Sequence, residues 1–403
     1  MPHVDIVTLG LLLLIACLVA IFTRRIGLPY AIGLVGAGII LSLAGYQSRI
    51  QLTPELIFTF LLPPLIFEAA LHLGWDMFRR EAPLVLSMAF VGTLLSAFVV
   101  AAGMHWLIGW GWQAALLFGS LIAATDPVSV IAMMKEQKAR QRLRFLMESE
   151  SIVNDGAAAV LFSLVAAWIA GESTGAGGMA LLLATTAGGG VLCGLAVAGA
   201  LLTIAGRSDD HLVELTLTVL AAYGSFLFAE KLHVSGVLAT LSAGMLAGNW
   251  GRGQRLTDYG SEAVIRFWDF AAFLANSVVF LLIGSREAAQ PLGVYLFPAA
   301  IGTLLVLLGR AVAVYPITAL FHGRALATDR MTQHILFWGG LRGALALALA
   351  LAAPAALPEH DALIGVAFAV VAFSIFVQGL TVPKLLKIAA ADNPESDVPL
   401  PAK

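Results

Sequence analysis

The sequence predicts an all-α, polytopic membrane protein, and three observations carry that prediction. Of its 403 residues, 60% are hydrophobic and only 12% are charged, which is far from the balance of a soluble protein. The hydrophobic residues gather in stretches long enough to cross the roughly 30 Å hydrocarbon core of a bilayer as helices. The sequence also lacks the short alternating segments that are typical of a membrane β-barrel. We therefore expect a bundle of membrane-spanning helices.

Thirteen apolar stretches are candidate spans, and a helix needs roughly 20 residues to cross the bilayer. The second and the ninth are short for this purpose. In chain order, the stretches cover residues 5–22, 29–44, 54–72, 82–108, 112–134, 147–170, 178–205, 211–229, 233–248, 263–284, 293–321, 333–353 and 361–386.

Lysines and arginines indicate the side of the membrane on which each loop lies, because positive residues are enriched in cytoplasmic loops. Most of the 23 such residues fall in every second loop, including the run from Lys135 to Arg144. The alternate loops hold only Arg49, Lys231 and Arg286. This asymmetry predicts an odd number of spans, with the N-terminus outside and the C-terminus in the cytoplasm.

Composition also limits the partners that we expect besides the lipid bilayer. The formal net charge of −2 gives no reason to expect a nucleic acid. Cys17 and Cys193 lie in apolar stretches, which favours buried thiols over a disulfide or a metal site. We expect a single transporter domain over residues 1–403 that uses no cofactor and no nucleotide. The predicted cytoplasmic tail, 388–403, is too short for a nucleotide-binding domain.

Three ionisable residues lie deep inside predicted spans. Asp126 and Asp155 are about 12 Å from the cytoplasmic ends of the fifth and sixth spans, and Arg342 is about 13 Å from that of the twelfth, at the helical rise per residue. A charge at the centre of a bilayer costs about 2.5–3.5 kcal/mol on insertion scales. Three such residues at one depth therefore indicate a functional site.

Two of these spans contain helix-breaking residues beside the charges. Pro127 follows Asp126, lacks a backbone donor and disfavours helix at the residue before it. Three glycines surround Arg342 within residues 339–343. Paired interruptions in the two halves of a chain are typical of inverted-repeat transporters, whose broken helices expose backbone groups to an ion. We expect discontinuous helices that cross near the membrane midplane.

The residues around Asp155 favour an ion that prefers hard oxygen ligands. Ser151 and Asp155 are four residues apart and share a helix face. Together with the oxygens of Thr125 and Asp126 they form a set without soft ligands, which suits an alkali cation or a proton better than a transition metal. Asn154 cannot ionise, so we expect it to brace the site through hydrogen bonds.

Four segments, in order, resemble the signature segments of monovalent cation/proton antiporters of the NhaP and sodium/proton exchanger type. They are LLPPLIFEAAL (61–71), ATDPVSV (124–130), ESESIVNDGAA (148–158) and GGLRGALALALAL (339–351).

The resemblance implies an architecture. It implies a homodimer in the cell membrane, with thirteen helices in each protomer and two inverted six-helix repeats. These repeats correspond to residues 5–170 and 211–386, with a linker helix at 178–205. It also implies a core domain that moves against a dimerisation domain.

The resemblance further implies residue roles. The ion site is expected to comprise Thr125, Asp126, Ser151 and Asp155. Glu68 is expected to line or organise the site, and Glu150 to pair with Arg342. Asn154 is the first member of an Asn-Asp pair, and family members with that pair exchange one cation for one proton electroneutrally. Apart from the resemblance, we expect a structural ion pair between Arg310 of the eleventh span and Asp269 of the tenth.

These features predict a secondary active antiporter, not an enzyme, that exchanges Na⁺, and also Li⁺, for H⁺. The two ions are expected to occupy Asp155 in turn and to exclude one another there. A K⁺-preferring or unselective exchanger stays open, because nothing in the side chains ranks the alkali ions. A cation channel built on the same ligands is the less favoured alternative. An intramembrane aspartyl protease is disfavoured, since its Tyr-Asp and Gly-x-Gly-Asp segments are absent from the sequence.

Overall fold

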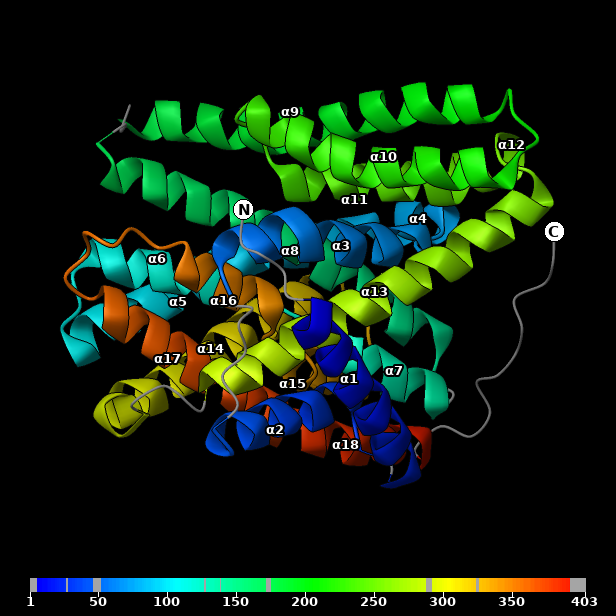
Figure 1. Cartoon of the computed structure of the whole chain (residues 1–403). Coiled ribbons are helices and arrows are strands. Elements are labelled where there is room, and N and C mark those ends of the chain that lie inside the picture. The colour runs from blue at the N-terminus through cyan, green and yellow to red at the C-terminus, as the bar shows by residue number, and fades with distance from the viewer. Residues whose placement is uncertain are drawn as a thin grey trace.

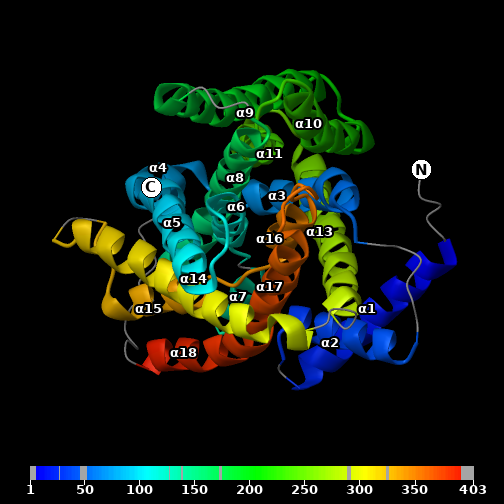
Figure 2. The ribbon, with the colours of Figure 1, turned by 90° about the vertical axis from the view of Figure 1, so that its left-hand side faces the viewer.

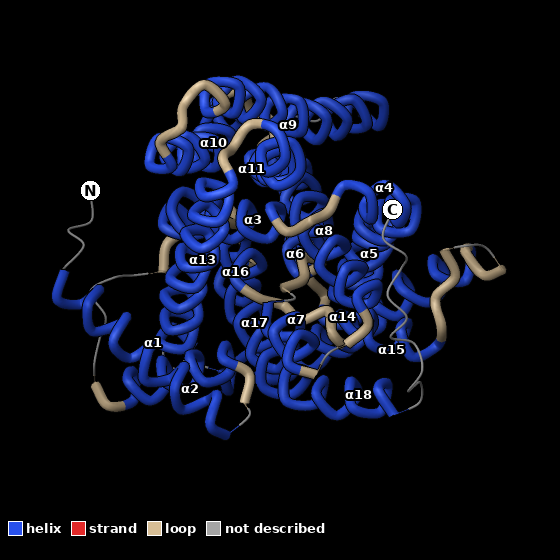
Figure 3. The backbone as a smooth tube through the Cα atoms, turned by 90° about the vertical axis from the view of Figure 1, so that its right-hand side faces the viewer, coloured by secondary structure: helices blue, strands red, loops and turns tan. Residues whose placement is uncertain are grey.

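The computed structural model describes residues 6–26, 28–45, 52–126, 128–137, 139–171, 175–287, 292–323 and 326–391. These residues form helices and short turns, and no strand occurs among them (Figure 3). Seven helices in the described part of the chain are long and apolar enough to cross a membrane. The predicted class, an all-α polytopic membrane protein, is confirmed.

Each predicted apolar stretch coincides with one continuous helical segment or with two segments separated by a break. The α-helices are α1 (Ile6–Ile26), α2 (Tyr30–Leu43), α3 (Leu62–Leu71), α4 (Trp75–Leu86), α5 (Thr93–Gly103), α6 (Trp112–Ile122), α7 (Val128–Glu136), α8 (Gln141–Ile169), α9 (Gly175–Ala205), α10 (His211–Lys231), α11 (Gly236–Leu246), α12 (Arg252–Gln254), α13 (Asp258–Glu287), α14 (Leu292–Leu320), α15 (Arg330–Trp338), α16 (Ala344–Leu351), α17 (His360–Phe373) and α18 (Gly379–Ala391). π-Helical segments are η1 (Leu56–Leu61), η2 (Ser87–Gly92), η3 (Met104–Ile108), η4 (Ala247–Gly251) and η5 (Ser374–Gln378).

The helices form a central group with flanking layers. Helices α9, α10 and α11 contact one another and form a layer along one side, at the top of Figure 1. Figure 2 shows α6, α16 and α17 in the interior, with α5 and α14 on one side and α13, α2 and α1 on the other. The interior is therefore built largely from the segments that the sequence marks as broken.

Both predicted breaks occur. Helix α6 ends at Ile122 and α7 begins at Val128, and the two run toward opposite sides of the molecule in Figure 1. Helix α15 ends at Trp338 and α16 begins at Ala344. The backbone amide of Asp126 donates to the carbonyl of Leu341 over 2.7 Å, which joins the two breaks directly. Pro127, the predicted cause of the first break, lies outside the described residues.

Three of the π-helical segments adjoin the interior. η1 precedes Pro63 and Pro64, whose missing amide hydrogens interrupt the regular α-helical bonding pattern. η2 leads directly into Thr93, and η5 begins at Ser374. π-Helical turns frequently lie at functional sites, and all three border the region described next.

Candidate functional site

A cavity of about 250 Å³ lies between α3, α8 and the two helix breaks. Lys135, near the end of α7, lines this cavity and is exposed, so the cavity reaches the surface there. The polar and charged residues on its wall are Glu68, Thr125, Asp126, Lys135, Glu148, Asp155 and Asn276. The structure thus brings residues from five separate stretches of the sequence to one cavity.

Asp155 on α8 has an incompletely satisfied carboxylate. Its Oδ1 is buried and has no hydrogen-bond partner among the described residues, although the residue lines the cavity. Leaving a buried acceptor without a partner costs about 1–3 kcal/mol, and more for a charged group. Such an oxygen is therefore suited to receive a proton or a cation that enters from the cavity.

The hydroxyls of Thr125 and Ser151 and the amide of Asn154 form a network beside this carboxylate. Thr125 Oγ1 donates to Ser151 Oγ over 3.0 Å, and Ser151 Oγ donates to the Thr125 carbonyl over 2.5 Å. Asn154 Nδ2 donates to Thr125 Oγ1 and to the Ala123 carbonyl, each over 3.1 Å. The network ties α8 to the unwound segment after α6, as a bracing role for Asn154 requires.

Thr93 extends this network and is absent from the sequence prediction. Its Oγ1 lies 2.6 Å from Asn154 Oδ1 and donates to it, so both ends of the Asn154 amide are engaged. Thr93 is the first residue of α5, directly after η2. A single threonine in an apolar span carries no signal in the sequence, because its role depends on how α5 packs against α8.

Asp126 lies against the second break. A Cβ atom built on Gly343 would come 2.1 Å from Asp126 Oδ2, so any larger residue at 343 would displace this carboxylate. Asp126, Asp155 and Gly343 all line the same cavity. Residue 343 in the second break is therefore a glycine because a side chain there would collide with the carboxylate of Asp126 in the first break.

Arg342 binds the open end of α6. Its Nη1 donates to the carbonyls of Ala123 and Ala124 over 2.7 and 2.9 Å, and its backbone amide donates to Ser374 Oγ over 2.8 Å. The last carbonyls of a helix lack partners within the helix and favour a nearby positive charge. Arg342 thus replaces the hydrogen bonds that the break in α6 removes.

Glu150 pairs with a different arginine from the one expected. Arg310 of α14 donates to both of its carboxylate oxygens, over 2.7 and 2.9 Å, and the two side chains are only 2% and 7% exposed. Arg310 also donates to the Leu336 carbonyl of α15. The predicted pairing of Glu150 with Arg342 is therefore wrong.

The expected pairing of Arg310 with Asp269 is also wrong, because Arg310 binds Glu150 while Asp269 lies near His72. Helix periodicity explains why Glu150 does not share the surroundings of Asp155. Glu150 and Asp155 are five residues apart, which places them about 140° apart around the helix axis. Glu150 consequently faces α14, and Asp155 faces the cavity.

The profile of a transmembrane family described as the sodium/hydrogen exchanger matches residues 12–388. The chain belongs to the sodium/hydrogen exchanger family.

Named relatives agree with this membership. This exchanger is 36% identical over 366 residues to the low-affinity Na⁺/H⁺ antiporter NhaS1 of Synechocystis, covering 89% of this chain and 69% of NhaS1. It is 32% identical to the Na⁺/H⁺ antiporter NhaP of Pseudomonas aeruginosa, covering 92% and 93% of the two chains. The solved sodium proton antiporter MjNhaP1 of Methanocaldococcus jannaschii shares the fold, with a TM-score of 0.77 at 20% identity over 95% of this chain and 97% of that one. The predicted antiporter family is confirmed, and it is a family of transporters rather than enzymes.

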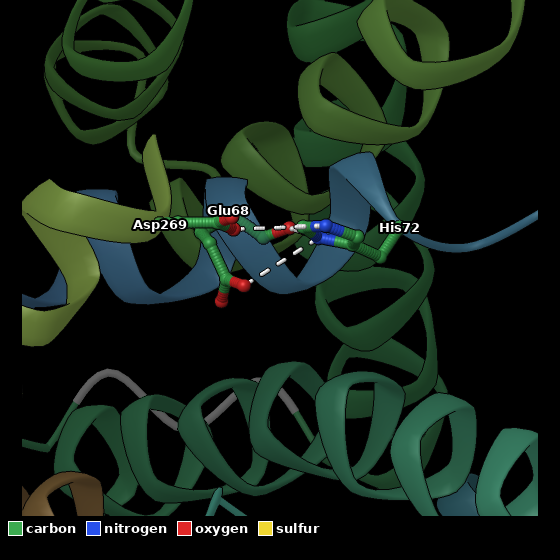
Figure 4. A group of neighbouring side chains, drawn as sticks. All are labelled: Glu68, His72 and Asp269. Atoms are coloured by element: carbon green, nitrogen blue, oxygen red, sulfur yellow. Dashed lines mark hydrogen bonds and ion pairs between the residues drawn. The ribbon is translucent and has the colours of Figure 1, made fainter. Parts of the chain in front are cut away.

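Glu68 of the exchanger is brought to the cavity wall, as its candidate role requires, but with neighbours that the sequence did not indicate. Its Oε1 lies 3.4 Å from His72 Nδ1, and His72 Nε2 lies 3.6 Å from Asp269 Oδ1 (Figure 4). Glu148 and Asn276 also line the cavity without having been predicted there. Glu148 stands in a signature segment, whereas Asn276 and Asp269 reach the cavity region only through the packing of α13 on α3.

Proposed function

We propose that this chain exchanges Na⁺, and also Li⁺, for H⁺ across the cell membrane, and that Asp155 is the residue on which the two ions alternate. One observation carries the assignment of Asp155. Its buried Oδ1 has no hydrogen-bond partner among the described residues, yet it lies on a cavity that reaches the surface. Family membership supports cation/proton exchange as the reaction, and Asp155 Oδ1 is the atom at which we expect the two ions to bind.

The cation ligands in this proposal are oxygens of Asp155, Asp126, Ser151 and Thr125. They are hard oxygen donors, which suit an alkali ion better than a transition metal. Arg342 and Asn154 position the ligands, because both bind carbonyls in the unwound segment that carries Thr125 and Asp126. No cofactor or nucleotide enters the cycle, since two opposed ion gradients drive the exchange.

Competition on a single carboxylate gives electroneutral exchange. A proton and a Na⁺ each bring one positive charge to Asp155, and either one neutralises it. If the protein changes the side to which the site opens only when Asp155 is neutralised, one cation crosses for each proton. An ionised carboxylate without a bound proton or cation is not expected to cross, because placing its charge in hydrocarbon costs the same electrostatic energy that makes such residues rare in membrane spans.

A second cavity supports alternating access. It measures about 410 Å³ and is lined by Phe58 of η1, Ala159 of α8 and Leu349 of α16, with the exposed Glu230 at its wall. The first cavity is lined by residues of the same α8 and α16 about one helical turn earlier, at Asp155 and Ala346, and by α3, which continues η1. A short shift of these helices would therefore transfer Asp155 from one cavity to the other.

The finer architecture belongs to the same proposal. We expect thirteen crossings in two inverted repeats, residues 5–170 and 211–386, with the linker helix 178–205 between them. We also expect a homodimer in the cell membrane, with the N-terminus outside and the tail 388–403 in the cytoplasm. The breaks at 123–127 and 339–343, one in each half, support the repeats.

The test uses the purified chain in proteoliposomes that hold an acidic interior and a pH-sensitive dye. Addition of Na⁺ or Li⁺ is expected to release the dye quenching, and clamping the membrane potential at zero is expected to leave the rate unchanged. An equal response to K⁺ would indicate the unselective exchanger instead. Single-channel currents, or full exchange by Asp155→Asn, would contradict the proposal.

A further inference from the structure

Glu68, His72 and Asp269 form a cluster at the edge of the ion cavity, which we call the α3–α13 cluster (Figure 4). Glu68 lies on α3, His72 directly follows that helix, and Asp269 comes from α13. One ligand atom of each residue lies within 4.8 Å of the other two. Two carboxylates and one imidazole thus converge from two helices, and the proposed exchange does not require His72 or Asp269.

The imidazole of His72 is arranged as a metal ligand. Its Nδ1 lies 2.9 Å from the Glu68 carbonyl oxygen, where an Nδ1–H donates a hydrogen bond. In that tautomer Nε2 carries the free lone pair, and Nε2 is the atom that faces Asp269. Histidines that bind metals commonly donate their other ring N–H to a backbone carbonyl in this way.

The spacing also fits a small divalent ion. Two ligands on a tetrahedral Zn²⁺ with bonds of about 2.0–2.1 Å are separated by about 3.3–3.4 Å. His72 Nε2 and Asp269 Oδ1 are 3.6 Å apart, so a shift of a few tenths of an ångström completes the geometry. The Glu68 carboxylate requires a larger side-chain adjustment, because its Oε1 lies 3.4 Å from Nδ1, the other nitrogen of the ring. Water would fill the fourth position.

The cluster is negative and accessible. The side chains of Glu68, His72 and Asp269 are 25%, 32% and 53% exposed, so a hydrated ion can reach them. Among the described residues, both carboxylates pair with His72, and neither forms an ion pair with a lysine or an arginine. His72 also caps the C-terminal end of α3, where the helix dipole favours a cation.

We propose that the α3–α13 cluster binds a divalent first-row transition-metal ion, with Zn²⁺ as the best fit to one imidazole and two carboxylates. The ion links Glu68 to Asp269 and holds the Glu68 carboxylate away from the cavity that it lines. It therefore inhibits exchange. The inhibition rests on the proposed function, whereas the binding does not.

Metal binding is measured first, on the full-length chain purified in detergent and freed of metal with a chelator. Co²⁺ is the optical probe, because a site with nitrogen and oxygen ligands gives visible absorption bands, and Zn²⁺ is then titrated calorimetrically. We expect one ion per chain in the wild type and at least tenfold weaker binding in His72→Ala and Asp269→Asn. His322→Ala, which removes an exposed histidine outside the cluster, is the matched control and is expected to bind as the wild type does.

If His72 serves only as a charged bridge between two carboxylates, Zn²⁺ will bind the wild type and His72→Ala equally, and that result overturns the proposal. Absence of binding to the wild type also overturns the proposal.

Exchange is then measured in vesicles with Zn²⁺ added to the side on which Lys135 is accessible. Zn²⁺ is expected to slow the wild type at least fivefold and to leave His72→Ala unaffected. Specific binding without inhibition would retain the metal site and overturn the link to Glu68. A chain that binds Zn²⁺ specifically but exchanges no cation even without metal would contradict the proposed function alone.

Discussion

Glu150 and Asp155 are two carboxylates on one helix, five residues apart, and their surroundings differ completely. Glu150 is held by two hydrogen bonds from Arg310 and is almost wholly buried. Asp155 borders a cavity that reaches the surface and has an oxygen with no partner among the described residues. Depth in the membrane therefore does not by itself identify an ion site. What distinguishes the two acids is whether the protein has already supplied the opposite charge.

Two buried arginines differ in the same way. Arg310 pairs directly with the carboxylate of Glu150, whereas Arg342 binds two backbone carbonyls at the end of α6. Arg342 therefore leaves Asp155 available while it keeps the unwound segment in shape. The variants below test whether the two acids differ in function as they differ in contacts.

The largest effect is expected from Asp155→Asn. Removing the charge removes the group for which proton and cation compete, so exchange should fall at least a hundredfold in proteoliposomes. The amide is close in size to the carboxylate, so the variant should elute from a sizing column as the wild type does. Glu262→Gln, which neutralises an exposed acid on α13, is the control and should retain full activity. Unchanged exchange in Asp155→Asn would erase the distinction between the two acids.

Glu150→Gln should act on stability. Removing one partner of a buried ion pair costs about 3–5 kcal/mol, because the other charge stays buried and unpaired. A thermal melt in detergent should therefore shift well below that of the wild type, with reduced folded yield.

Replacing both members of this pair gives the complementary test. The double variant Glu150→Leu, Arg310→Met leaves no unpaired charge and should melt closer to the wild type than Glu150→Gln does. If Glu150→Gln melts normally yet loses Na⁺ binding, Glu150 belongs to the ion site and the comparison fails.

Asp126→Asn should weaken Na⁺ binding, because it removes one of the two carboxylates that are proposed as cation ligands. A tenfold rise in the apparent KM for Na⁺ corresponds to about 1.4 kcal/mol, a reasonable loss for one charged ligand. Initial rates of dye dequenching at a series of Na⁺ concentrations measure it. An unchanged KM would remove Asp126 from the set of ligands.

The dependence of the apparent KM on pH tests competition directly. Protons occupy the carboxylate that Na⁺ needs, so wherever protons and Na⁺ compete for Asp155 and protons prevail, the apparent KM should rise about tenfold for each unit by which the pH falls. The maximal rate at saturating Na⁺ should change much less. A KM for Na⁺ that is independent of pH over the same range would mean that the two ions bind at separate places.

Thr93→Val should have the smallest effect. It removes one hydrogen bond to Asn154 at nearly constant volume, for which the expected loss is about 0.5–1.5 kcal/mol. Exchange should fall two- to tenfold, with no change in the relative rates for Na⁺ and Li⁺. Thr185→Val, on an exposed face of α9, is the matched control and should have no effect. Wild-type exchange in Thr93→Val would show that Asn154 is positioned sufficiently by α8 and the Ala123 carbonyl.

The class of the protein and the location of its helices follow from the sequence alone. Apolar stretches, Pro127 and the glycines of 339–343 predict helices and their breaks, since length, hydropathy and backbone freedom are local properties. The sequence also determined the family, through four short segments, and indicated that Asp126, Asp155 and Arg342 lie at a common depth.

Which charges meet depends on the tertiary structure. Two arginines lie inside predicted spans, and both have side chains long enough to reach several partners, so spacing along the chain did not distinguish Arg310 from Arg342 as the partner of Glu150. The rotation of each helix about its axis, set by packing over its whole length, decided that choice. The same packing brought Asp269 to His72 and Thr93 to Asn154 across long stretches of sequence. Such pairs depend on the relative placement of helices, which no local property of either segment contains.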